Sequence, residues 1–186
     1  MLVSVKRRLK MEGRATMEVK DIVVMELDNL GQGMTRLLDG LNHQELSWRP
    51  AYGYNSIGLI AFHMGRFEDS TVQVRIQGKP EVWESEKWYL KLNLPVTEAG
   101  AHYNTEQVSA FPVPELRELM GYTDAVRQRT MQYLKNATPE QLDKRITMPR
   151  TGETPIAAIF ARVVGHLFQH IGEISYLRGL QRGMDK

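Results

Sequence analysis

The sequence predicts an all-α protein built as a four-helix bundle. Four segments of roughly 20 to 27 residues repeat apolar side chains every three or four positions, as helices with one buried face do. No strand pattern of any length separates these segments, and their apolar stripes are narrow, as is typical of helix bundles. A length of 186 residues, with 42% hydrophobic and 25% charged residues, indicates one globular domain.

The first predicted helix covers about residues 18–41 and ends at a Gly-Leu-Asn sequence. Asn42 and Glu45 then have the spacing of a capping box, which predicts one short helical turn. The second predicted helix opens at Asn55 or Ser56, because both residue types cap helix N-termini well. The Gly-Lys-Pro sequence at 78–80 closes it.

A connector of 36 residues, 78–113, follows the second helix. Long loops without secondary structure are uncommon in compact domains, so we expect this one to contain short helices or to cover a site. Its length also permits a crossover, which would let the second and third helices run parallel.

The third predicted helix covers residues 114–136, since proline is favoured in a first helical turn. Residues 138–141 read as a capping box that opens a brief helix, and residues 143–153 as a loop or a small hairpin. The fourth helix starts at 154–155, with a threonine cap followed by proline, and runs to about residue 180.

Three of the five histidines fall on or beside the predicted buried faces. His166 and His170, four residues apart, share one face of the fourth helix, and His63 lies at the edge of the buried stripe of the second. Each imidazole can be satisfied separately by a carbonyl or a carboxylate. The paired spacing plus an inward third histidine favours a divalent cation instead, with coordination positions left open for water or substrate.

Acidic residues near these histidines have two interpretations each. Glu173 follows His170 by three residues and can orient its imidazole, or can pair with Arg178. Glu68 and Asp69 follow His63 and can support the site, but a surface charge is the default reading for both.

Aromatic residues gather in the predicted connectors, where they either cap the core or form a pocket wall. His43 and His102 also lie in connectors, and we expect both to be solvated. Arginines near the site are candidates to hold an anionic part of a substrate. The predicted pocket residues are Trp48, Arg49, Arg66, Trp83 and Trp88.

The absence of cysteine excludes disulfides, thiolate nucleophiles, iron–sulfur clusters and cysteine zinc sites. Any thiol in the chemistry must therefore come from a separate molecule. Leu167 follows His166, so the zinc-protease sequence H-E-x-x-H is absent, and no histidine has a glutamate three residues before it, which excludes a di-iron carboxylate bundle. No apolar run has the length of a membrane span.

Charge is concentrated at the N-terminus, where residues 1–20 carry +4 and the remainder carries −2. No apolar stretch follows the basic start, so we expect no secretion and a cytoplasmic protein. We interpret residues 1–16 as a flexible basic extension, which is either a frayed leader or the result of an upstream start codon with Met17 as the natural beginning. Residues 17–186 are expected to form a single domain. The slightly acidic body and the lack of a basic face argue against nucleic-acid binding.

Two blocks of sequence resemble the DinB/YfiT-like superfamily over about residues 17–183. One is Leu-Ser-Trp-Arg-Pro at 46–50 with Asn-Ser-Ile-Gly at 55–58 and His63; the other runs from His166 through His170 to the Tyr-Leu-Arg-Gly at 176–179. The resemblance implies an up-down-down-up four-helix bundle, a homodimer, and a divalent metal, often zinc or nickel, held by His63, His166 and His170. The family name records damage-inducible expression of one relative.

Characterised members of this superfamily include thiol S-transferases that use bacillithiol or similar thiols, and the mycothiol-dependent maleylpyruvate isomerase. The resemblance therefore implies a metal-dependent enzyme that transfers a low-molecular-weight thiol to a small electrophile. A metal-dependent hydrolase is one alternative, and a non-enzymatic metal- or ligand-binding stress-response protein is another. A purely structural bundle with buried histidines is the remaining interpretation.

Overall fold

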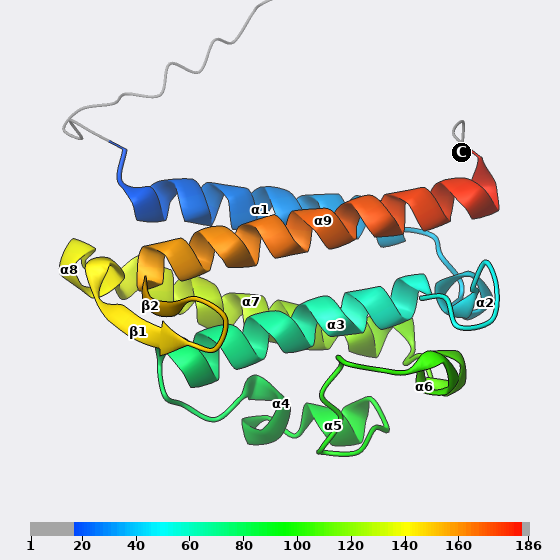
Figure 1. Cartoon of the computed structure of the whole chain (residues 1–186). Coiled ribbons are helices and arrows are strands. Elements are labelled where there is room, and N and C mark those ends of the chain that lie inside the picture. The colour runs from blue at the N-terminus through cyan, green and yellow to red at the C-terminus, as the bar shows by residue number, and fades with distance from the viewer. Residues whose placement is uncertain (1–16, 184–186) are drawn as a thin grey trace, which may run out of the picture.

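The computed structural model describes residues 17–183, which form a mostly helical structure with one small sheet (Figure 1). The predicted basic extension at 1–16 lies outside the described residues. The four long helical elements confirm the predicted helical architecture. They are α1 (Val19–Leu38), α3 (Ile57–Asp69) continued by the π-helix η1 (Ser70–Ile76), α7 (Leu116–Asn136) and α9 (Ile156–Arg182).

The helix starts follow the capping residues of the sequence. Asn42 opens the short helix α2 (His43–Ser47) through a capping box with Glu45, and the Ser56 side chain accepts a hydrogen bond from the backbone N–H of Leu59 at the start of α3. Thr138 opens α8 (Pro139–Asp143) in the same way. These three predicted starts are confirmed, because such caps depend only on residues a few positions apart.

The core lies where α3 packs against both α7 and α9, while α1 packs chiefly on α9. Leu27, Phe62, Tyr122 and Phe160 are fully buried there, one from each long helix. Close packing at the start of α3 requires a glycine, since a Cβ at Gly58 would lie 2.2 Å from the Val113 side chain. Apart from Met148 and Ile159, the buried apolar side chains of the described residues belong to one continuous cluster.

The connector between η1 and α7 contains three short helices, α4 (Val82–Ser85), α5 (Trp88–Lys91) and α6 (Thr105–Ala110), as its length predicted. Asp69 ties it to the bundle. Its carboxylate accepts hydrogen bonds from the backbone N–H groups of Val82 and Trp83, each at 2.9 Å. The reading of Asp69 as a surface charge was therefore wrong, since the fold buries it completely.

Glu68 is also buried rather than exposed, and it binds Arg127 of α7. The guanidinium Nη2 lies 2.7 Å from Glu68 Oε2, and Nη1 donates to the Leu27 carbonyl of α1. A buried charge needs such a partner. The partner comes from another helix, so the local sequence around Glu68 does not reveal the pairing.

A hairpin precedes α9, with β1 (Arg145–Met148) antiparallel to β2 (Gly152–Pro155). Of the two alternatives predicted for residues 143–153, a loop or a small hairpin, the structure therefore has the hairpin. Its two strands are too short to give a detectable strand pattern in the sequence. Thr154 belongs to β2 and does not cap α9, which corrects the predicted helix start. Instead, the Ile156 N–H binds the Lys144 carbonyl at 3.0 Å.

No helix within residues 17–183 combines the length and the apolar character that crossing a membrane requires.

Candidate metal centre

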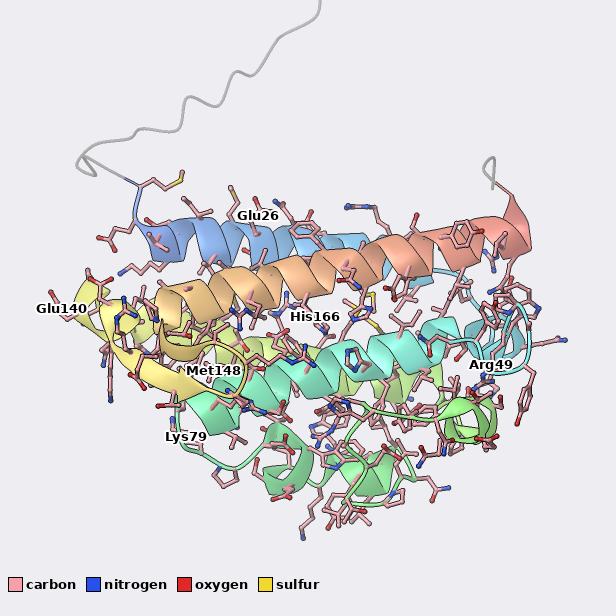
Figure 2. All side chains as sticks on the ribbon, in the orientation of Figure 1. Glu26, Arg49, Lys79, Glu140, Met148 and His166 are labelled. Carbon is pink, nitrogen blue, oxygen red and sulfur yellow. The ribbon has the colours of Figure 1, made fainter. Side chains whose placement is uncertain are left out.

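Three histidine side chains meet where α3 packs on α9. His63 comes from α3, and His166 and His170 come from successive turns of α9. One ring nitrogen of each lies within 4.8 Å of the others, and the Nε2 atoms of His63 and His166 are 3.0 Å apart. In Figure 2 the labelled His166 lies between the ribbons of these two helices.

Hydrogen bonds at the outer ring nitrogens determine which nitrogens are free to bind a cation. His63 Nδ1 lies 2.7 Å from the carbonyl oxygen of Gly100, and His170 Nδ1 lies 2.8 Å from a Glu173 carboxylate oxygen. Both partners only accept, so both Nδ1 atoms carry the proton and donate. In neutral rings, the Nε2 atoms of His63 and His170 therefore keep their lone pairs.

His170 Nε2 is buried and has no hydrogen-bond partner among the described residues. A buried polar atom without a partner is costly, and such atoms are rare in native structures. A divalent cation bound by the three Nε2 atoms would satisfy it. Three imidazoles with carbonyl and carboxylate support at Nδ1 are a donor set suited to such an ion.

The electrostatics of the site keep two of these imidazoles neutral. Burial lowers the pKa of His63, although its hydrogen bond to Gly100 opposes the effect. Burial also lowers the pKa of His166 to about 4, and its two histidine neighbours add to this shift. Neutral imidazole is the form that binds metal ions, so both side chains are in the ligating form near neutral pH.

Two cavities open beside the histidines. The larger, about 490 Å³, touches His63 and His166, and the smaller, about 240 Å³, touches His63 and His170. The connector lines both of them through residues in the range 99–103, so it covers the candidate site. Among the described residues, no aspartate or glutamate lines the larger cavity, whereas four arginines do: Arg66, Arg75, Arg150 and Arg162.

Arg66 holds the connector in place against α3. Its Nε donates to the Glu98 carbonyl at 3.1 Å, and its Nη2 lies 2.8 Å from a Glu81 carboxylate oxygen. Gly100 follows at φ +70°, where a Cβ would lie 2.7 Å from Arg66 Cγ, so only glycine fits. This contact brings the Gly100 carbonyl to His63. The sequence analysis did not identify Gly100 or Glu98 as part of the site. The one signal in the sequence was the presence of a glycine, Gly100, within the long connector.

The other predicted site residues have separate positions. Glu173 contacts His170, as one of its two interpretations expected, while the Arg178 guanidinium donates to backbone carbonyls at the end of α1. His102 is exposed, as expected, and it also lines both cavities. His43 lies at the surface, 3.3 Å from a Glu115 carboxylate oxygen.

The structure places the three tryptophans and Arg49 outside the lining of both cavities. Trp83 is fully buried, with its indole N–H donating to the Val96 carbonyl, and Trp88 packs against Tyr122 of α7. Trp48 ends α2, and Arg49 donates to the Phe111 carbonyl. Trp83 therefore lies within the core and Trp88 packs against it, rather than beside the histidines.

Comparisons with known proteins show the family and the fold. The family model of the DinB superfamily matches residues 26–174. A crystal structure of a conserved protein from Enterococcus faecalis is similar at 23% identity and a TM-score of 0.80, covering 91% of this chain and all of that one. YfiT from Bacillus subtilis, described as a probable metal-dependent hydrolase with an unusual four-helix bundle topology, is similar at 14% identity and a TM-score of 0.59, covering 94% of both chains. Among curated proteins, none matches.

Proposed function

The chain belongs to the DinB superfamily, and from this premise we propose that it is a divalent-metal-dependent enzyme that transfers a low-molecular-weight thiol to a small electrophile. His63, His166 and His170 would hold the metal, which we propose to be zinc or nickel. Three imidazoles also accept cobalt, copper and ferrous iron, so availability would contribute to the choice. The unpartnered, buried Nε2 of His170 is the observation that carries this proposal.

A bound divalent cation would lower the pKa of a coordinated thiol or water and so produce a nucleophile near neutral pH. The chain's own residues would orient the site. The Gly100 carbonyl and the Glu173 carboxylate fix the rings of His63 and His170, so that both Nε2 atoms face the same point. Since the chain has no cysteine, the thiol would be a second substrate.

The larger cavity supports an anionic partner for this reaction. Arg75, Arg150 and Arg162 form no ion pair with any described residue, so their charges are available to a bound molecule. Arginine binds carboxylate and phosphate groups in a planar, two-pronged geometry. We propose that these side chains hold a carboxylate of the thiol or of the electrophile.

Metal-dependent hydrolysis is the second candidate, favoured by the description of YfiT. It would need a general base to accept a proton from water. Glu68 is engaged with Arg127, and Glu173 with His170 and Gln169, while no acidic side chain within residues 17–183 lines the larger cavity. These engagements make thiol transfer the better supported of the two reactions.

The proposal extends to the fold and assembly. We propose an up-down-down-up bundle, and Figure 1 supports it: α9 begins near the end of the bundle where α1 begins, whereas α3 and α7 both begin at the opposite end. We also propose one domain over residues 17–186, a cytoplasmic location, a homodimer in solution, and no partnership with nucleic acid or membranes.

Elemental analysis of untagged protein tests the site. We expect about one metal ion per chain in the wild type, loss of that metal in His63→Ala and in His170→Ala, and full content in His43→Ala, whose imidazole lies at the surface. Absence of metal from the wild type even after reconstitution would leave a structural bundle. Retention of metal by the first two variants would show that the ion binds elsewhere.

Turnover assays then separate the reactions. We expect the metal-loaded protein to conjugate small thiols to an electrophile such as a chlorodinitroarene, and to lose this activity with the metal. Thiol-independent cleavage of an ester or amide would instead support the hydrolase. A loaded site with neither activity would support a metal-binding stress-response protein.

A further inference from the structure

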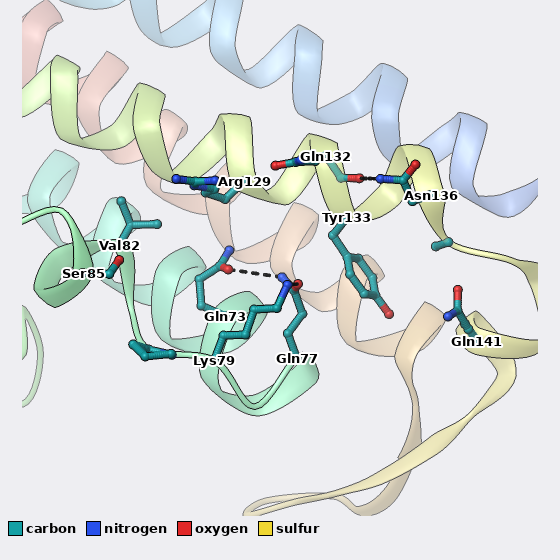
Figure 3. Close-up of a pocket in the computed structure, with 12 residues that line it drawn as sticks. Gln73, Gln77, Lys79, Val82, Ser85, Arg129, Gln132, Tyr133, Asn136 and Gln141 are labelled. Carbon is teal, nitrogen blue, oxygen red and sulfur yellow. Dashed lines mark hydrogen bonds between the residues drawn. The ribbon is translucent and has the colours of Figure 1, made fainter.

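A third cavity, of about 490 Å³, lies between η1, the loop after it, α4, α7 and α8 (Figure 3). It shares no lining residue with the two cavities beside the histidines. Its size is in the range of small-molecule sites. Because the proposed metal chemistry makes no use of it, its polar lining needs a separate explanation.

The side chains around this cavity favour an anion. In the part of the chain that the structure describes, no aspartate or glutamate lines it, whereas Lys79 and Arg129 do. Arg129 is balanced by Glu86, 2.8 Å away, but Lys79 forms no ion pair with a described residue. Several side-chain amides and one phenol supply further hydrogen bonds. They belong to Gln73, Gln77, Gln132, Asn136, Gln141 and Tyr133.

A chain of hydrogen bonds determines how the amide of Gln73 is oriented. Lys79 Nζ can only donate, so the Gln77 atom 2.9 Å from it is the carbonyl oxygen. The side-chain nitrogen of Gln77 therefore faces Gln73 and donates to the side-chain oxygen of Gln73, Oε1, at 3.2 Å. The Gln73 amide nitrogen is left with its N–H groups unpaired.

That nitrogen is buried and has no hydrogen-bond partner among residues 17–183. Gln73 is only 4% exposed, so bulk water does not replace the missing partner. In Figure 3 its amide points into the space between η1 and α7. A buried donor aimed into a cavity is costly unless an acceptor arrives there.

The backbone around Gln73 is also unusual. Residues 70–76 form a π-helix, in which the Gln77 N–H binds the Val72 carbonyl five residues before it. The Lys79 N–H then binds the Gln73 carbonyl at 2.8 Å, which folds the loop back over the helix end. π-Helical turns are rare and occur frequently at functional sites. Here the turn brings Gln73, Gln77 and Lys79 to one wall.

We propose that this cavity binds a small polar molecule that carries an oxyanion, either a phosphate or a carboxylate. Lys79 balances its charge, and the unpaired N–H groups of Gln73 donate to one of its oxygens. The amides of α7 and α8 contact the rest of the molecule. This site is independent of the three histidines.

Isothermal titration of the full chain with inorganic phosphate and with succinate tests the proposal. We expect one of the two to bind, which identifies the class of oxyanion, with about tenfold weaker binding to Lys79→Gln. Lys135→Gln is the matched control, since Lys135 is an exposed lysine of α7 outside the cavity lining. Binding to this variant should equal that of the wild type.

Two further variants locate the site. Gln73→Glu keeps the shape but replaces the free N–H groups by a carboxylate, and should abolish binding, while His63→Ala should leave binding unchanged. If Gln73→Glu does not fold, as circular dichroism would show, Lys79→Gln decides, because Lys79 is exposed. Absence of binding in the millimolar range, equal binding to Lys79→Gln, or loss in His63→Ala would each overturn the proposal.

Discussion

Removal of the Glu173 carboxylate should weaken metal binding by about tenfold. Glu173 Oε2 accepts a hydrogen bond of 2.8 Å from His170 Nδ1, and this bond holds the ring so that Nε2 faces the other two histidines. A hydrogen bond to a charged group contributes about 1.5–3 kcal/mol. The Glu173 side chain is 39% exposed, so we take the lower value. About 1.4 kcal/mol corresponds to a tenfold change in affinity, at the lower end of the range for groups that support metal ligands.

Competition with a chromophoric chelator would measure this loss in Glu173→Ala. Glu173→Gln keeps a neutral acceptor for His170 and should lose only part of the affinity, which separates the charge from the hydrogen bond. Glu118→Ala is the control, since Glu118 lies on another helix, in the first turn of α7. Wild-type affinity in Glu173→Ala would refute the reasoning, as would equal losses in Glu173→Ala and the control.

Three further predictions concern stability. Arg127→Met should reduce the free energy of unfolding by about 3–5 kcal/mol, because it leaves Glu68 buried at 3% exposure without its ion-pair partner. Urea denaturation measures this loss, and the double variant with Glu68→Leu should regain part of it. In the same assay, Gly58→Ala should reduce the free energy of unfolding by about 1–3 kcal/mol, because the added methyl group overpacks the core. Gly172→Ala is the control and should be neutral or slightly stabilising, since no atom lies within 4 Å of the added Cβ. Equal effects of the two substitutions would contradict the packing argument. Hydrogen bonding to Arg182 lowers the pKa of Glu45 to about 2, so the unfolded chain takes up this proton at a higher pH than the folded chain, and stability should fall as pH drops from about 4.5 towards 2. Glu45→Gln should show a shallower fall in stability over this range. An unchanged pH profile in this variant would argue against a stabilising Glu45–Arg182 pair.

Local signals in the sequence predicted the helices well. The caps at Asn42, Ser56 and Thr138 depend on hydrogen bonds to residues three positions away, so spacing along the chain contains the information. The shared face of His166 and His170 follows from the helical repeat in the same way. Periodicity also placed His63 at the edge of a buried face, but it did not establish what the residue meets there.

Several features depended on contacts between distant parts of the chain. Asp69 and Glu68 looked like surface charges until α4 and α7 supplied their partners. Thr154 does not cap α9 as predicted, because its pairing with Ile146 of β1 outweighs the local preference of threonine for a helix N-cap. Trp83 and Trp88 pack on Tyr122 of α7, because their part of the connector folds across the core.

By itself, the sequence determined the mostly helical character, the capped starts of α2, α3 and α8, and the helical faces of the three histidines, because each is encoded within one or two turns of helix. Only the tertiary structure decided what surrounds those histidines. Gly100 reaches His63 across 37 positions of sequence, and His166 reaches it across 103. The cavity lined by Gln73 and Lys79 likewise exists only where η1 packs beside α7. Such contacts depend on how whole elements exclude water together, and no short window of sequence records that packing.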